Sequence, residues 1–229
     1  MKPELSITLP IYNEEKGIEI TIKNLVKQLE KQNINYELVL VNHGSWDNTK
    51  KILERLGREN KRLQVINLAK NLGYGGGIMY GFKHSKGNNI GWVCADEETS
   101  AKDACKLYQD YKKGDYDVVK AIRIKRTDGK LRMFTSFVFN FLIALRFNLH
   151  IKDVNGYPFY MKKQIFNSLK VKEKNYLFNL DLLHEIRKNK YVVKEIPVIH
   201  GKRKTGKTYM KPSRIIKMAY GFFKYSIGY

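Results

Sequence analysis

Short apolar runs alternate with longer amphipathic segments over the first 122 residues of the chain. In the segment Glu15–Lys31, apolar residues recur every three or four positions, which is typical of one face of a helix. Strands that alternate with helices predict an α/β fold with a mostly parallel sheet and right-handed crossovers. We expect strands at Leu5–Tyr12, Tyr36–Val41, Leu63–Leu68, Asn89–Cys94 and Val118–Ile122, and helices at Glu15–Lys31, Asp47–Arg58, Gly73–Ser85 and Ala101–Lys112.

Charge is distributed unevenly between the two halves of this 229-residue chain. Residues 1–119 carry 18 basic and 16 acidic side chains, whereas residues 120–229 carry 25 basic and 6 acidic side chains. A strongly basic half indicates an anionic partner, which could be nucleic acid, a membrane surface or a phosphorylated substrate. Nucleic acid is the least favoured of these, because the chain has no helix-turn-helix, RNP or KH pattern.

Two cysteines, Cys94 and Cys105, are too few for a disulfide framework, and no Cys/His spacing suggests a structural zinc site. Reduced thiols and the absence of a recognisable signal peptide predict a cytosolic location. The length predicts one domain with an elaboration rather than two full domains.

The second half of the chain contains two apolar segments. Met133–Leu145 has 13 residues without a charge, fewer than the roughly 20 that a membrane-spanning helix needs. It is expected to be a buried helix or a segment at a membrane interface. A helix over about 212–227 is expected to lie in the interface or to dock on the protein core. Its apolar face would carry Ile215, Ile216, Ala219, Phe222 and Phe223.

Polar residues follow three of the expected strands, at Pro10–Glu14, Asn42–Asp47 and Asp96–Glu98. Each cluster alone could be an ordinary turn or helix cap. In open α/β sheets, however, ligands bind outside the carboxyl ends of the strands, and three clusters at one edge favour a ligand cleft. Asp96 and Glu98, two positions apart on an extended segment, could share a hard cation that bridges nucleotide phosphates.

Basic residues form two groups in the second half. One is the turn Arg203–Thr208 around Gly206, and the other contains Arg123, Arg126 and Arg132. Arginine binds phosphate with two hydrogen bonds, and lysine binds it as a point charge. Both groups could equally be solvated loops of a basic protein. The glycines of Gly73–Gly77 lack the spacing of a phosphate-binding loop, and we expect them to allow a tight helix entry.

Taken in order, these segments resemble one family. Leu9–Glu14 matches V-x-P-x-Y-N-E, and Val41–Thr49 resembles V-D-D-G-S-x-D-x-T. Cys94–Glu98 lies where the family has D-A-D-x-Q. Glu195–Val198 followed by Arg203–Thr208 resembles E-x-P-V and then R-x-x-G-x-S. The family is that of inverting GT-A fold glycosyltransferases (family 2), in the polyprenyl-phosphate sugar synthase (dolichol-phosphate mannose synthase-like) group.

The resemblance implies a GT-A fold and the transfer of a sugar from a nucleotide-sugar to a polyprenyl phosphate at the cytoplasmic membrane face, with inversion. Asp96 and Glu98 would hold Mg²⁺ or Mn²⁺. The implied donor-binding residues are Pro10, Tyr12, Asn13, Glu14, Asn42, Gly44, Ser45, Asp47, Gly73 and Ala95. The implied acceptor- and phosphate-binding residues are Arg126, Arg132, Ser136, Asp153, Arg203, Lys207 and Thr208, and the implied catalytic residues are Asp96, Arg203 and Lys207.

The chain also departs from the family pattern. Asn42 and His43 stand where the family has two aspartates that help to hold the nucleotide, so the sequence does not indicate which nucleotide base is bound. Cys94 replaces a carboxylate and is a poor ligand for Mg²⁺, so weaker metal binding is expected. Two alternatives follow. One is transfer to a saccharide hydroxyl, for which Asp153 is the candidate base, and the other is a protein that binds a nucleotide or a partner without turnover.

As one domain, the chain would have a nucleotide-sugar-binding half at residues 1–122 and a basic acceptor and membrane-side half at residues 123–229. Membrane attachment would rest on the basic surface, the C-terminal helix or a membrane-anchoring partner protein.

Overall fold

The computed structural model describes residues 2–126, 129–201 and 212–228, without the side chains of residues 130–132 and 212–217. Within these residues the strands form one seven-stranded sheet in the order β3-β2-β1-β4-β6-β5-β7. Strand β6 runs antiparallel to β4 and β5, and the other neighbours are parallel. The strands are β1 (Leu5–Ile11), β2 (Tyr36–Asn42), β3 (Leu63–Asn67), β4 (Asn89–Trp92), β5 (Val118–Ile124), β6 (Phe159–Lys162) and β7 (Val193–Ile199).

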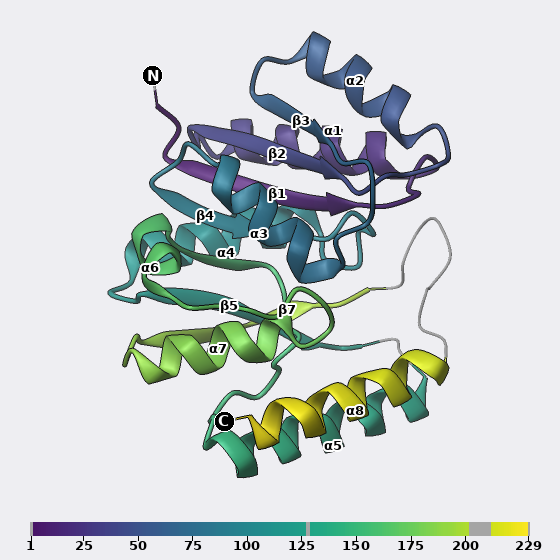
Figure 1. Cartoon of the computed structure of the whole chain (residues 1–229). Helices are drawn as coiled ribbons and strands as arrows, with labels where there is room; N and C mark the ends of the chain where they lie inside the picture. Colours follow the sequence, from purple (N-terminus) through teal and green to yellow (C-terminus); the bar gives the residue numbers. More distant parts are fainter. Residues whose placement is uncertain (1, 127–128, 202–211, 229) are drawn as a thin grey trace.

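Helices cover both faces of the sheet (Figure 1). One apolar core lies between the sheet and α1 (Ile18–Lys31), α2 (Thr49–Glu59) and α4 (Ala101–Lys113). The second core lies on the opposite face, where buried residues of the sheet meet the other helices. These helices are α3 (Tyr74–His84), α5 (Lys130–Phe147), α6 (Lys163–Ser168), α7 (Phe178–Lys188) and α8 (Pro212–Ile227).

The glycines of α3 let this helix approach its neighbours closely. A Cβ atom at Gly75 would collide with Phe178, one at Gly77 with His43, and one at Gly81 with Thr8 of β1. The glycine-rich segment therefore serves close packing, as the sequence predicts, and brings the start of α3 down onto the carboxyl ends of β1 and β2.

The α/β prediction is confirmed, and the strands and helices expected in the first half are present with shifts of a few residues at their ends. Strand β6 is the main difference from the expectation. It inserts antiparallel between β4 and β5, so that the second half of the chain completes the sheet of the first half.

Helices α5 and α8 lie side by side (Figure 1). The rings of Phe139 and Phe222 are 5.9 Å apart between centroids, and those of Phe147 and Tyr225 are 5.4 Å apart. The apolar face expected around 212–227 is thus divided, because Phe222 packs on α5 while Phe223 is 63% exposed. Other large side chains of this pair also face outward, namely Phe134, Phe137, Phe141, Leu145, Tyr220 and Ile227.

The charge-free segment Met133–Leu145 lies within α5. It is only partly a buried helix, since Phe139 and Ile143 are buried whereas Phe137 is 68% exposed. Its contact with a membrane interface stays a prediction. Among the described residues, none of the helices combines the length and the hydropathy that a membrane-crossing segment needs.

Candidate active site

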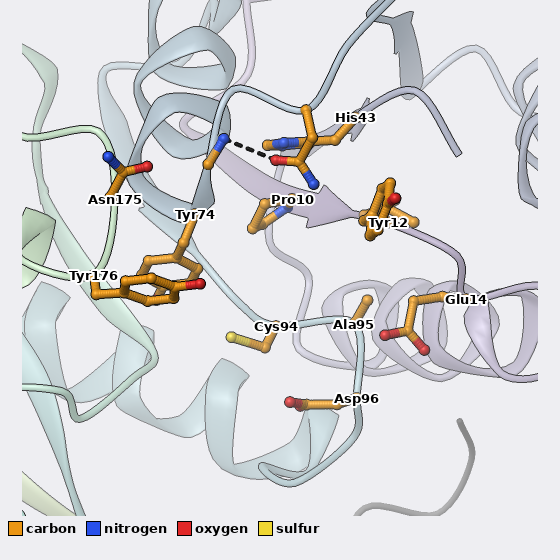
Figure 2. A pocket seen from close by; sticks show the side chains of 13 residues that line it. Pro10, Tyr12, Glu14, His43, Tyr74, Cys94, Ala95, Asp96, Asn175 and Tyr176 are labelled. Carbon is orange, nitrogen blue, oxygen red and sulfur yellow. Dashed lines mark hydrogen bonds between the residues drawn. The ribbon is translucent and has the colours of Figure 1, made fainter. Parts of the chain in front are cut away.

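A cavity of about 280 Å³ lies at the carboxyl ends of β1 and β4, beside the start of α3 (Figure 2). The turn after β1 and the turn Asp96–Glu98 after β4, here called the acid turn, contribute to its walls, and the cluster after β2 contributes His43. Of the expected donor-binding residues, five reach the cavity: Pro10, Tyr12, Glu14, Gly73 and Ala95. The remaining lining residues are Ile11, His43, Asn71, Tyr74, Cys94, Asp96, Asn175 and Tyr176.

The turns after β1 and β2 hold each other in place. The backbone N–H of Asn13 donates to Ser45 Oγ at 2.9 Å, and the N–H of Trp46 donates back to Asn13 Oδ1 at 3.0 Å. The N–H of Glu15 donates to Asp47 Oδ2 at 3.2 Å. Asn13, Ser45 and Asp47 therefore shape the rim of the cavity without lining it, and Gly44 takes the left-handed backbone (φ 68°) that this turn requires.

Asn42 and His43 make the β2 end of the site electrically neutral. Asn42 Oδ1 accepts from the N–H of Ser45 at 3.1 Å, and its Nδ2 donates to Asn67 Oδ1 at 2.8 Å, so both ends of the amide are engaged within the protein. Burial lowers the pKa of His43, against a smaller opposing effect of Asn71. The imidazole is therefore neutral at pH 7 and packs against Gly77.

Asp96 and Glu98 converge on one hydroxyl group, that of Tyr157. Tyr157 Oη donates to Glu98 Oε2 at 3.0 Å and lies 3.5 Å from both carboxylate oxygens of Asp96. Burial raises the pKa of the Tyr157 phenol well above its ordinary value, and the neighbouring acidic groups add to this effect. The phenol thus stays protonated, and its one proton is donated to Glu98 while the Asp96 carboxylate lies beside it.

The end of β7 reaches the same acid turn. His200 Nε2 is 3.2 Å from Glu98 Oε2, and the N–H of Gly201 donates to the carbonyl oxygen of Glu98 at 2.8 Å. Both Tyr157 and Gly201 come from the basic half of the chain, so Glu98 is positioned by residues more than fifty positions away in the sequence.

The acid turn has a partial set of ligands for a divalent cation. Asp96 and Glu98 supply two carboxylates near one point, which suits Mg²⁺ or Mn²⁺, with further ligands from phosphate oxygens and water. Burial raises the pKa of the Cys94 thiol well above its usual range, so Cys94 offers a neutral thiol. Within the described part of the chain, no group of three His, Cys, Asp or Glu side chains is arranged to hold a metal ion by itself.

Asp153 forms a two-point ion pair with Arg123 in the basic half. Arg123 Nε donates to Asp153 Oδ2 and Arg123 Nη2 to Asp153 Oδ1, both at 2.8 Å. Although burial opposes it, this guanidinium lowers the pKa of Asp153 to about 2. A general base works best with a pKa near the operating pH. Asp153 is therefore unsuited to the role of base that the hydroxyl-acceptor alternative would give it.

Buried charges hold the Asp153 segment in place. Lys120 is fully buried on β5, and its ammonium group contacts the carbonyl oxygen of Asp153 and Glu195 Oε1. Glu195 accepts from the N–H groups of Lys152 at 2.8 Å and Asp153 at 3.2 Å. The glutamate of the E-x-P-V segment thus acts as an anchor for the chain before β6.

The remaining expected acceptor residues are only partly described. Arg126 Nη1 donates to Ser136 Oγ at 3.1 Å, which brings two of them together at the start of α5. The side chain of Arg132 and residues Arg203, Lys207 and Thr208 lie outside the described residues.

The structure brings several residues to the site that the sequence did not indicate: Tyr74, Tyr157, Asn175, Tyr176 and His200. Tyr74 is the first residue of α3, and the others lie in connecting segments without a periodic pattern. The positions of Tyr157, Asn175, Tyr176 and His200 depend on how β6, β7 and the segment before α7 return to the sheet, and no local spacing could reveal this.

Comparisons with known proteins agree with this geometry. The family model for "Glycosyl transferase family 2" matches residues 6–170. An uncharacterised glycosyltransferase of Synechocystis sp. is 30% identical over 74% of this chain and 54% of its own length. The undecaprenyl-phosphate 4-deoxy-4-formamido-L-arabinose transferase of Edwardsiella ictaluri is 28% identical over 94% of this chain and 66% of its own length. The chain thus spans between about half and two thirds of these relatives.

A solved structure shares the fold. Glucosyl-3-phosphoglycerate synthase from Mycobacterium tuberculosis, in complex with Mn²⁺, UDP-glucose and phosphoglyceric acid, superposes with a TM-score of 0.76. The two sequences are 16% identical, and the match covers 99% of this chain and 80% of that one. The likeness confirms the expected GT-A fold. The sequence match over 6–170, the sheet and the placement of the cavity lead to one conclusion: the chain belongs to glycosyltransferase family 2.

Proposed function

We propose that this protein transfers a sugar from a nucleotide-sugar to a polyprenyl phosphate, with inversion at the anomeric carbon. The observation that carries the proposal is the convergence of Asp96 and Glu98 on Tyr157, beside a cavity at the carboxyl edge of the sheet. We also propose that the chain acts as one domain, with its donor half in residues 1–122 and its acceptor half in residues 123–229.

The donor end binds the nucleotide diphosphate beside the acid turn. Asp96 and Glu98 hold Mg²⁺ or Mn²⁺, which supplies charge neutralisation to the departing diphosphate. The hydroxyl of Tyr157 and the backbone N–H of Gly201 keep Glu98 in position for this role. The solved structure of the Mycobacterium tuberculosis synthase, which contains Mn²⁺ and UDP-glucose, supports a metal-assisted nucleotide-sugar donor.

The acceptor end needs no general base when the acceptor is a phosphate. A phosphate oxygen is already anionic and can attack once it is held in line with the leaving group. The pairing of Asp153 with Arg123 supports this choice, because it leaves Asp153 unsuited to deprotonate a hydroxyl. The name of the Edwardsiella relative, which acts on undecaprenyl phosphate, points the same way.

Residues outside the described part complete the proposed acceptor site. Arg203 and Lys207 bind the acceptor phosphate and the diphosphate in this proposal, together with Arg126, Arg132 and Thr208. Their segment follows β7 in the sequence, and β7 ends beside Glu98.

The acceptor is a membrane lipid, so the protein is proposed to work at the inner face of the membrane. The outward side chains of α5 and α8, including Phe137, Leu145 and Phe223, form an apolar surface. The half of the chain that carries it has 25 basic and 6 acidic residues, which favours anionic headgroups. A membrane-anchoring partner could strengthen this attachment.

A thermal-shift panel with UDP, GDP and CDP, each with and without Mg²⁺ or Mn²⁺, tests the donor end. A nucleotide at about 100 times its dissociation constant adds roughly 2.7 kcal/mol, or on the order of 5–10 °C in the unfolding midpoint. The proposal predicts a shift for one nucleotide that increases with metal. If none of the three nucleotides shifts the midpoint, the alternative of a protein that binds a partner without turnover would be favoured.

A further inference from the structure

The segment from Lys170 to Tyr176, here called the strap, leads into α7 and is held by two buried carboxylates of that helix. The N–H of Lys170 donates to Glu185 Oε2 at 3.0 Å. The N–H groups of Lys172 and Glu173 both donate to Asp181 Oδ2, at 2.6 and 2.8 Å. Asp181 is fully buried and also accepts from Tyr225 of α8. These bonds fix the backbone of the strap.

The far end of the strap forms one wall of the cavity. The N–H of Gly76 donates to the carbonyl oxygen of Lys174 at 2.8 Å, which fastens the strap to α3. Gly73 leaves room for the Asn175 side chain, which a Cβ atom there would strike. Figure 2 shows Asn175 and Tyr176 on the side of the cavity opposite Tyr12 and Glu14, with Cys94 and Asp96 between the two sides.

The position of Asp96 divides the cavity into two ends. If the diphosphate lies at Asp96, the nucleoside extends toward the turns after β1 and β2, near Glu14. The sugar then lies toward Asn175 and Tyr176. This assignment rests on the proposed function, since it takes the diphosphate position from it.

The lining at the strap end suits an uncharged sugar. Its side chains are an amide (Asn175), a thiol (Cys94) and two phenols (Tyr74 and Tyr176). An amide can donate to and accept from sugar hydroxyls, and an aromatic ring can cover the apolar face of a pyranose. Among the described lining residues there is no Lys or Arg to pair with a sugar carboxylate. A buried carboxylate without a partner is costly, and Asp96 and Glu14 would repel it.

We propose that Asn175 and Tyr176 form the sugar-recognising end of the donor cavity and that this end takes an uncharged hexose rather than a hexuronate. Binding should therefore separate into two parts. The nucleoside diphosphate alone should not need the strap side chains, whereas the complete nucleotide-sugar should need both.

Calorimetric titrations of wild type, Asn175→Ala, Tyr176→Ala and Lys172→Ala test this inference. The probes are UDP, UDP-glucose and UDP-glucuronate, or GDP, GDP-mannose and GDP-mannuronate if the nucleotide panel selects guanine. Lys172→Ala is the matched control, because it changes an exposed side chain of the strap that does not line the cavity. We expect the two cavity variants to bind the neutral nucleotide-sugar about tenfold more weakly and the diphosphate within about twofold of wild type.

A gain-of-function variant guards against loss through misfolding. Asn175→Arg supplies the missing cation and is expected to improve binding of the uronate donor while it weakens binding of the hexose donor. Equal losses for diphosphate and nucleotide-sugar, no loss for either, or a wild-type preference for the uronate would each overturn the inference. If wild type binds no nucleotide at all, the proposed function fails first, so the two failures are distinguishable.

Discussion

The proposed donor and acceptor halves of this site are built in different ways. The donor half consists of turns that follow the strands and hydrogen-bond to one another, as Asn13 does with Ser45 and Trp46. The acceptor half depends on buried charges from distant segments, where Lys120, Asp153 and Glu195 meet around the chain before β6. Single changes in the donor half should therefore affect ligand binding, and single changes in the acceptor half should affect stability first.

The largest effect is expected at Asp153. Asp153→Ala leaves the guanidinium of Arg123 buried without its carboxylate, and removal of one partner of a buried ion pair typically costs about 3–5 kcal/mol. Urea unfolding should show this loss in the free energy of unfolding. A loss below about 1 kcal/mol would mean that the acceptor half does not depend on this charge pair.

Asp96 offers the opposite case in the donor half. Asp96→Asn should leave the unfolding midpoint of the ligand-free protein nearly unchanged, because asparagine has nearly the same shape and keeps an oxygen that can accept from Tyr157 Oη. The additional stabilisation that metal gives to the nucleotide complex, up to about 2.7 kcal/mol at 100 times the dissociation constant, should disappear. Metal-dependent shifts of wild-type size in this variant would remove Asp96 from the cation site.

Acid pH should weaken the acceptor half through Asp153. Its pKa is about 2 in the folded chain against an ordinary 3.8, so the unfolded chain takes up the proton first as the pH falls. The stabilisation, about 2 kcal/mol, is present above pH 4 and is lost as the pH falls toward 2. The difference in unfolding free energy between wild type and Asp153→Asn should shrink over this range, and a constant difference would refute the pairing.

The smallest effect concerns the surface of α5 and α8. Phe137→Ala removes one outward aromatic side chain and should lower partition into anionic vesicles about tenfold, with unfolding unchanged. Ile20→Ala is the matched control, since Ile20 is an exposed apolar residue of α1, on the other face of the sheet. Equal partition of both variants and wild type would exclude this surface from membrane contact.

The contrast between the halves also explains what the sequence could predict. Asp96 and Glu98 follow a strand with a clear apolar pattern, so the sequence could predict that they lie at the carboxyl edge of the sheet. The sequence-based argument for a shared cation takes the segment as extended, whereas Glu97 between them has a left-handed backbone (φ 54°). Tyr157 and His200 reach Glu98 only because β6 inserts antiparallel and β7 ends beside the acid turn. Such contacts depend on tertiary topology. The pairing of Asp153 with Arg123 likewise argues against the role of general base that the hydroxyl-acceptor alternative gives to Asp153. The sequence alone does not show which cation a carboxylate pairs with.

The measurement that tests the central claim most directly compares two acceptors that differ only in their phosphate. Vesicles that contain either undecaprenyl phosphate or undecaprenol are incubated with the protein and with Mg²⁺ or Mn²⁺. The donor is a nucleotide-sugar with a labelled sugar, and its nucleotide is the one that the thermal-shift panel selects. We predict labelled lipid from undecaprenyl phosphate and none from undecaprenol, because Asp153 is paired with Arg123 and cannot act as a base toward a hydroxyl. Transfer of label to undecaprenol would contradict this prediction. So would a protein that binds the donor but transfers label to neither lipid.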